Sequence, residues 1–174
     1  ICAGASQGPL VASGVQQLGI EHARIFGSAP GAFVSGLRAL VALEARVSPC
    51  EVTINLLGVP PAHPVIPWSS ATISGYPIEA TLSPPQLARL RDRASQLWPP
   101  GPFVLASAAA RVVEAVVVGG ARQAFACFVD EGSGAGVGAR SVAVTLGPGG
   151  IEEVLLPTLS RLERVRLENA PRKS

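Results

Sequence analysis

The side chains best suited to nucleophilic chemistry are those of His63, Ser69 and Ser70, which follow one another within one short segment. A histidine that accepts the proton of a serine hydroxyl activates that serine for acyl transfer. Neither serine, however, has the flanking glycines of a nucleophile elbow, which disfavours hydrolase chemistry. His22 and His63 are the only histidines, and together with Cys50 they lack the spacing of a metal-ligand set. The sequence therefore predicts no metal site.

The charge distribution and the cysteine content restrict the binding partners and the cellular compartment that the sequence predicts. The 14 basic residues outnumber the 12 acidic ones by two, all but Lys173 are arginines, and they are spread along the chain. This distribution does not predict a nucleic-acid-binding surface. Cys2, Cys50 and Cys127 are far apart and odd in number, which favours buried thiols in a reducing cytoplasm over disulfides. The longest apolar run, residues 112–118, is too short to cross a bilayer, and no signal peptide is visible.

Helical periodicity and capping patterns predict the elements that must position any site. Five segments show this periodicity: residues 8–19, 30–46, 83–97, 103–118 and 160–169. Ser83 with Gln86, and Ser160 with Glu163, have the spacing of capping boxes. The fourth segment is almost entirely apolar and ends at residues 119–120, so we expect a deeply buried helix.

Shorter apolar segments between turn residues predict strands. They are residues 23–26, 52–57, 123–129, 141–146 and 151–156, and residues 72–76 predict a strand and a turn. Four prolines between residues 60 and 67 predict a rigid loop or an edge strand there. Glycine-rich turns at residues 132–138 and 147–150 join the last three strands. This order of elements predicts an α+β fold in which helices pack on antiparallel strands.

The first half of the chain carries motifs that resemble those of the malate and lactate dehydrogenase family. Residues 24–28 resemble the family's RVIGSG turn, and residues 37–49 its FRxxLAxxLGVxP helix and exit. Residues 57–70 have the frame of the loop that holds the family's catalytic histidine. Within it, Val65 and residues 68–70, followed by Gly75-Tyr76-Pro77, are similar to the family's VPxWS…GxPL pattern.

The second half continues the same resemblance in the family's order. Residues 108–115 are similar to its AAAxxxxVEAIL helix, and residues 146–154 to its LGxxGVEKI hairpin. The resemblance implies that residues 1–174 form one C-terminal, substrate-binding domain of this family. Residues 1–29 are then the junction from an N-terminal Rossmann domain, which binds NAD in the family. The opening residues, which resemble the end of a buried strand, fit that expectation.

The chain shows no dinucleotide-binding fingerprint of its own. Such a fingerprint needs a strand, a GxGxxG turn and a helix in succession. Residues 132–136 are rich in glycine but join two strands, so they predict a hairpin turn. We therefore expect NAD to bind only together with the N-terminal domain, and not to this chain alone.

The family's chemistry needs a histidine to exchange a proton, a carboxylate to orient it and an arginine to clamp the substrate carboxylate. The resemblance places these three groups at Pro60, Phe33 and Gly36. It places the family's conserved asparagine and a later hydroxyl residue at Ala5 and Pro102. None of these five residues has the required chemistry. The pattern resembles a paralogue that has left dehydrogenase chemistry.

Two residues keep a catalytic interpretation open. His63 lies three residues beyond the place of the family's histidine, and the prolines could redirect it into the cleft; otherwise it is a surface histidine. Arg38 matches the second arginine of the family's LDSARFR motif. It is a candidate for binding a substrate anion, or else a helix-surface residue in a salt bridge to Glu44 or Glu21.

Two functions follow from these observations. The first is the substrate-binding domain of a malate dehydrogenase-like, NAD-dependent 2-hydroxy-acid oxidoreductase, divergent or catalytically silent, with a small 2-hydroxy or 2-keto acid as ligand. The second is a non-enzymatic homologue used for oligomeric assembly or for sensing a small ligand or anion. Since the family's members are dimers or tetramers, the resemblance also implies a homo-oligomer. We expect a cytoplasmic protein with no nucleic-acid or membrane partner.

Overall fold

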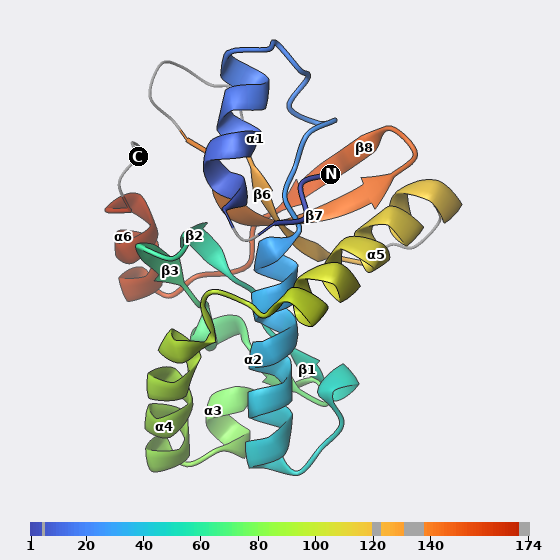
Figure 1. The fold of residues 1–174 in the computed structure, drawn as a ribbon. Helices are drawn as coiled ribbons and strands as arrows, with labels where there is room; N and C mark the ends of the chain where they lie inside the picture. Colours follow the sequence, from blue (N-terminus) through green and yellow to red (C-terminus); the bar gives the residue numbers. More distant parts are fainter. Residues whose placement is uncertain (5, 120–122, 131–137, 171–174) are drawn as a thin grey trace.

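Helices and antiparallel strands alternate along the chain, as the sequence predicts (Figure 1). The computed structural model describes residues 1–4, 6–119, 123–130 and 138–170. Its helices are α1 (Gln7–Gln16), α2 (Ala29–Ala45), α3 (Ile78–Thr81), α4 (Pro84–Ala94), α5 (Pro102–Val118) and α6 (Arg161–Glu168), with short 3-10 turns η1 (Pro49–Glu51), η2 (Trp68–Ser70) and η3 (Ser95–Leu97). The strands are β1 (Val52–Thr53), β2 (Leu57–Val59), β3 (His63–Val65), β4 (Thr72–Ile73), β5 (Tyr76–Pro77), β6 (Phe125–Val129), β7 (Arg140–Gly147) and β8 (Gly150–Leu155). The predicted α+β class is confirmed.

Two sheets, both antiparallel, are formed by the described strands. The larger has the order β3-β2-β7-β6, with β8 also paired to β7. The β6–β7 ladder aligns Cys127 of β6 with Val142 of β7. The smaller sheet, β1-β4-β5, follows α2 in the sequence. The proline-rich segment forms the edge strand β3, where the missing N–H of Pro64 does no harm.

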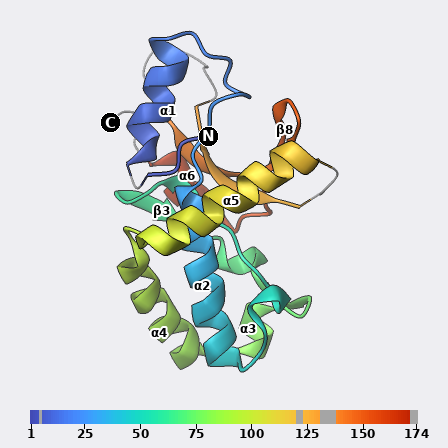
Figure 2. The same cartoon turned by 45° about the vertical axis from the view of Figure 1, so that its right-hand side comes forward.

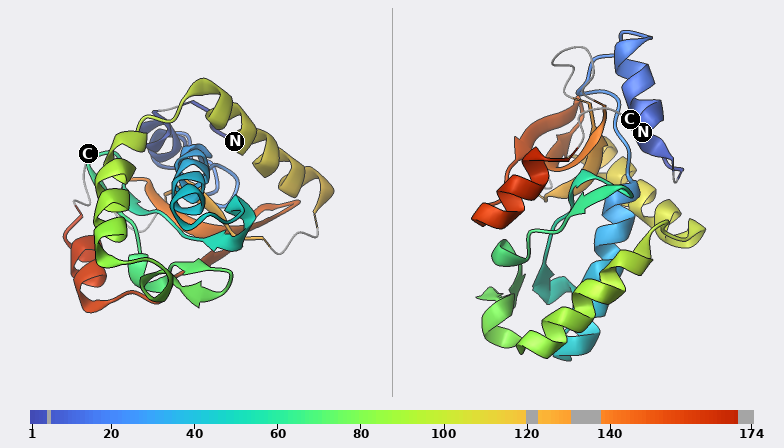
Figure 3. Two further views of the ribbon diagram at one scale, coloured as in Figure 1. Left: turned by 90° about the horizontal axis from the view of Figure 1, so that it is seen from below. Right: turned by 90° about the vertical axis from the view of Figure 1, so that its left-hand side faces the viewer.

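Helix α2 occupies the centre of the structure. Viewed from below, it is ringed by the other elements, and α5 crosses over it (Figures 2 and 3). Leu37 and Val41 of α2 are completely buried in a cluster that also takes in the smaller sheet and α4. Pro30 starts the helix, since its missing N–H is not needed in the first turn, and Arg46 ends it in the left-handed conformation with φ 57°.

The capping patterns are confirmed. Ser83–Gln86 and Ser160–Glu163 both form capping boxes, at the starts of α4 and α6. The five predicted helices all form, within a few residues of their expected ends. The glycine-rich residues 132–136, Gly120 and Ala5 lie outside the described residues.

Three sequence predictions need correction. Helix α5 is not deeply buried: only one face, including Leu105 and Val112, is covered, while Phe103 is 89% exposed. Residues 23–26 form no strand, because a turn occupies residues 21–24 and Gly27 makes only single bridges to Cys2 and Phe128. The predicted strand 52–57 divides between two different sheets: Val52–Thr53 form β1 of the smaller sheet, and Leu57 begins β2 of the larger one.

Among the described residues, no single helix is both long and apolar enough to cross a bilayer. Helix α4 with η3, taken together with α5, reaches the required length and composition, but the two are bent by 90° at their junction.

A substitution at Gly150 can test how closely the β7–β8 hairpin packs against the segment before α2. Its φ is +110°, and a Cβ there would lie 2.1 Å from the carbonyl oxygen of Ala23. We expect Gly150→Ala to lower the free energy of unfolding by about 2–4 kcal/mol, from backbone strain and displacement of Ala23. Gly149→Ala, which meets nothing within 4 Å, is the matched control. Urea unfolding followed by tryptophan fluorescence measures both, and equal midpoints would contradict this packing.

Candidate functional site

A cleft of about 680 Å³ is walled by α1, the turn between β2 and β3, the segment between η3 and α5, and β6. Of its described lining residues, only Ser6 and Gln7 have polar side chains, and none is titratable. The volume lies in the range of small-molecule sites. The cleft therefore has the size of a ligand site but, in its described walls, no group that carries charge or exchanges protons near neutral pH.

Aromatic rings form one wall of the cleft. The Trp98 ring lies 6.1 Å from that of Phe128, edge to face, and 6.2 Å from that of Phe33 behind it. Trp98 and Phe128 line the cleft, and Phe33 is buried in the core around α2. Aromatic pairs of this kind contribute about 0.5–1.5 kcal/mol each beyond the area they bury. This wall is consequently rigid and apolar.

Gln7 is the one buried polar side chain at the cleft. It is 1% exposed, and its Oε1 accepts a hydrogen bond of 2.8 Å from the backbone N–H of Ala29 at the start of α2. Because only the amide oxygen accepts this bond, Nε2 must be the other end of the group, and it has no partner. A buried donor left unpaired costs about 1–3 kcal/mol. Gly27 has no room for a side chain, since a Cβ there would meet Gln7.

The positions that the resemblance assigns to catalysis have apolar roles in this structure. Pro60 lines the cleft and is buried, and Phe33 packs behind Trp98. Gly36 faces Leu97, whose Cδ2 would lie 3.5 Å from an added Cβ. Pro102 is exposed at the first position of α5. At each of these positions, the structure therefore has an apolar residue where the resemblance expects a polar group.

His63 does not line the cleft. It lies on the edge strand β3, is exposed, and pairs with Val59 across the hairpin. In sequence it directly follows Ala62, the last residue of the β2–β3 turn that lines the cleft. A proton-carrying role for His63 stays a prediction.

Arg38 lines a second, much smaller pocket, of about 30 Å³, between α2 and α5. Arg111 of α5 lines the same pocket, together with Asn55 and Gln123. Burial, and then the charge of Arg111, lower the pKa of Arg38, although a guanidinium keeps its charge at neutral pH. The Nε of Arg38 is buried without a hydrogen-bond partner. Two like charges therefore meet in one small concavity.

The salt bridge expected for Arg38 is not present. Glu44 pairs instead with Arg89 of α4, at 2.7 Å. The sequence did not predict the contribution of Arg111, because α2 and α5 are brought together only by the fold. Glu44 lies on the same helix as Arg38, so sequence position alone suggests it as a partner. Sequence position carries no information about a neighbour from another helix, such as Arg111.

The cysteines also depart partly from expectation. All three are free thiols, but Cys50 is exposed and Cys2 is half-buried. Only Cys127 is fully buried, and burial raises the pKa of its thiol to about 12. Within the described ranges, no group of three or more His, Cys, Asp or Glu side chains is placed to hold a metal ion.

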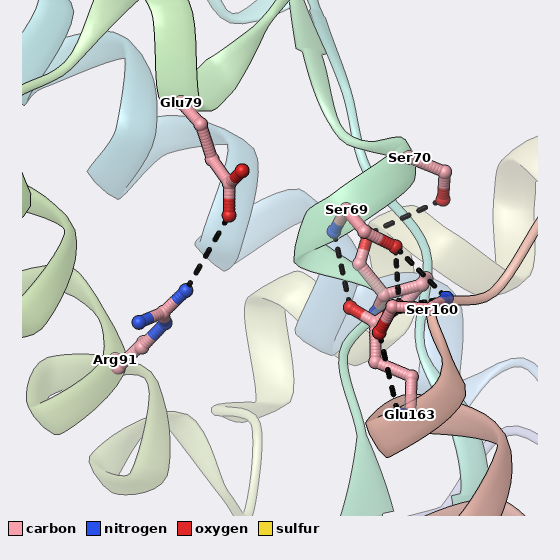
Figure 4. Close-up of polar contacts among 7 residues, drawn as sticks. Ser69, Ser70, Glu79, Arg91, Ser160 and Glu163 are labelled. Atoms are coloured by element: carbon pink, nitrogen blue, oxygen red, sulfur yellow. Dashed lines mark hydrogen bonds and ion pairs between the residues drawn. The ribbon is translucent and has the colours of Figure 1, made fainter.

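A polar cluster outside the cleft fastens α6 to η2 (Figure 4). Glu163 accepts hydrogen bonds from the backbone N–H and the hydroxyl of Ser69, and from both the N–H and the hydroxyl of Ser160 at 2.8 Å. Burial alone would favour the neutral carboxyl, but these donated bonds outweigh it, so the pKa of Glu163 is lowered. Nearby, Glu79 and Arg91 form an exposed ion pair at 4.0 Å.

No family model matches the sequence. Solved structures, however, share its fold. A lactate dehydrogenase from Cryptosporidium parvum superposes with a TM-score of 0.83 and 21% identity, over 94% of this chain and 59% of that one. The malate dehydrogenase from Aeropyrum pernix gives 0.83 and 15%, over 95% and 58%. A minor L-lactate dehydrogenase from Enterococcus mundtii gives 0.79 and 18%, over 92% and 56%.

These likenesses confirm the predicted fold, that of the C-terminal part of lactate and malate dehydrogenases. The chain spans less than three-fifths of the length of these structures. The Cryptosporidium enzyme has also been solved with lactic acid and nicotinamide adenine dinucleotide. Among the described residues of this chain, both sheets are antiparallel, and no strand leads through a glycine-rich turn to a helix start, which is the arrangement of a dinucleotide-binding fold.

The Glu163 cluster predicts a specific acid sensitivity. Because the folded-state pKa is lowered, its stabilisation is complete above the ordinary carboxyl pKa of 4.5 and is lost as pH falls toward the folded value. We expect Glu163→Gln to lower the free energy of unfolding at neutral pH by about 1–3 kcal/mol and to flatten its decline below pH 4.5. Urea titrations across pH measure this, with Glu168→Gln, exposed on the same helix, as control. Parallel pH profiles for wild type and Glu163→Gln would refute the assignment.

Proposed function

We propose that this chain is the substrate-domain counterpart of a lactate or malate dehydrogenase-like protein that no longer carries out hydride transfer. The observation that supports this most directly is the composition of the cleft, whose described walls contain no titratable side chain. Reduction of a 2-keto acid requires a proton for the oxygen atom as hydride arrives at carbon. It also requires a cation for the substrate carboxylate.

The residues at the positions of the family's catalytic groups lack the required polar atoms, and they also disfavour binding of a charged substrate. Pro60 has a pyrrolidine ring where the resemblance places the proton carrier, and Phe33, where it places the orienting carboxylate, packs at a tilted angle against Trp98. Placing an α-keto acid, which is an anion, against these walls would strip its carboxylate of water without compensation. Turnover of a 2-keto acid is by the same reasoning expected to be absent, whereas NAD binding belongs, by the resemblance, to an N-terminal domain.

A second candidate function, the binding of a small anion, is favoured by the paired arginines. Arg38 and Arg111 line one pocket, and Arg38 retains an unpaired, buried Nε. Asn55 and Gln123 add amide groups to the same walls. An anion placed there relieves the repulsion between the two guanidinium groups and accepts from the unpaired donor. This role needs no redox chemistry and is compatible with a silent cleft.

Homo-oligomerisation is part of the proposal, and α5 supports it. Its exposed face carries apolar side chains at alternating spacings of three and four residues: Phe103, Ala106, Ala110, Val113 and Val117. Phe103 and Val117 lie seven residues on either side of Ala110, so an antiparallel second copy centred on Ala110 would place Phe103 of one chain against Val117 of the other. A cytoplasmic location is also proposed, supported by three free thiols.

The first test is single-turnover oxidation of NADH by the intact protein, with oxaloacetate and then pyruvate. At enzyme concentrations above that of NADH, we expect no oxidation beyond the rate in buffer, for both wild type and His63→Ala. Turnover by the wild type that disappears in His63→Ala would overturn the proposal, since it would make His63 the proton donor.

The anion candidate predicts stabilisation by sulfate at constant ionic strength. If sulfate binds with a dissociation constant of about 1 mM, roughly 20 mM raises the melting temperature of the wild type by about 3–6 °C. Arg111→Gln should abolish this rise, whereas Arg93→Gln, an exposed arginine of α4, should keep it. Equal rises in all three proteins would show that sulfate acts by general exclusion from the surface, and would refute the site.

A further inference from the structure

The cleft has the features of a binding site for a class of ligand unlike a hydroxy acid. We infer that it binds an uncharged, largely aromatic small molecule that carries one hydrogen-bond acceptor, such as a ketone or ether. This inference rests on the proposed loss of hydride transfer, because the same walls that cannot support that chemistry select the ligand.

The walls set the charge and shape of the ligand. Along the cleft, Val59, Pro60, Pro61 and Ala139 present aliphatic surface, and Trp98 presents an indole. A planar aromatic ring loses little hydration when it packs against such surfaces. A carboxylate or an ammonium group, by contrast, has no counter-charge in the described walls. The volume, about 680 Å³, accommodates a molecule of two or three fused rings.

Gln7 sets the position of the acceptor. Its carbonyl end is committed to the N–H of Ala29, at 2.8 Å, and this bond anchors the amide at the start of α2. Its Nε2 is buried, unpaired and part of a residue that lines the cleft. A ligand oxygen that reaches this group satisfies a donor that the protein itself leaves unmet. Ser6, the other polar residue of the wall, lies next to Gln7, so the polar end of the ligand faces the start of α1.

Pre-organisation strengthens the inference. The Phe33–Trp98–Phe128 series fixes the indole from behind, and Phe128 is 2% exposed. The Gln7 amide is held by the backbone of a buried helix end, where Ala29 is completely buried. The apolar wall therefore stands in place before a ligand arrives, with the Gln7 amide fixed beside it, which lowers the entropy lost on binding.

Prodan, an uncharged naphthalene ketone, is a suitable probe because its emission reports both an apolar surrounding and a hydrogen bond to its carbonyl. We expect it to bind the intact protein with micromolar affinity and a blue-shifted emission. Ala62→Trp, at an exposed position of the cleft wall, should weaken binding at least tenfold by filling the cleft. Ala88→Trp, exposed on α4 outside the cleft, should leave it within twofold of wild type.

The anionic probe anilinonaphthalene sulfonate tests whether the cleft selects against charged ligands. We expect any binding of this probe to be insensitive to Ala62→Trp. No binding of prodan, or equal binding in the Ala62→Trp and Ala88→Trp variants, would overturn the ligand inference while leaving the loss of hydride transfer intact. NADH turnover, by contrast, would overturn the proposed function whatever prodan does, so the two failures are separable.

Discussion

The burial of α2 is the constraint on which the rest of this structure depends. Leu37 and Val41 are completely enclosed, and Gly31 lets the helix approach so closely that an added Cβ would lie 3.3 Å from the carbonyl oxygen of Ala126 in β6. One side of the helix thereby fixes the large sheet, while α4, α5 and the small sheet pack on the others. Both candidate sites are consequences: the cleft lies at its start, where Gln7 caps Ala29, and the paired-arginine pocket lies along its length.

The same helix explains how a dehydrogenase-like frame can survive without its chemistry. In the resemblance, the carboxylate and the arginine clamp belong to this helix, at positions now occupied by Phe33 and Gly36. A buried charged pair is expensive to keep in a core unless function requires it. Instead of such a pair, the helix has an aromatic ring at one position, which packs on Trp98, and no side chain at the other, which faces Leu97. These two residues give a well-packed helix. The proposed loss of catalysis and the observed packing are then two aspects of one substitution pattern.

How much of this could be predicted from the sequence differs between local and long-range features. Capping boxes at Ser83 and Ser160 and the glycine and proline punctuation identify the helices, because their signals lie within a few residues. The exposure of α5 could not be predicted, since an apolar face looks the same whether its own core or another surface covers it. The sequence also predicted the chemistry missing at Pro60, but not the pairing of Arg38 with Arg111 or the Trp98–Phe128 wall. Those contacts join elements far apart in the chain, and no spacing rule encodes them.

We propose that the cleft accepts an uncharged ligand and does not accept a 2-keto acid. The most direct measurement is the indole N–H resonance of Trp98 in the intact protein, titrated separately with prodan and with oxamate, a charged analogue of a 2-keto acid. Trp68, which is buried in the core around α2 and does not line the cleft, supplies an internal reference signal. We expect prodan to shift the Trp98 resonance and oxamate to leave it unchanged, with the Trp68 resonance unchanged in both titrations. A saturable shift of Trp98 by oxamate would contradict it, because a carboxylate would then be held where the described walls offer no charge to receive it.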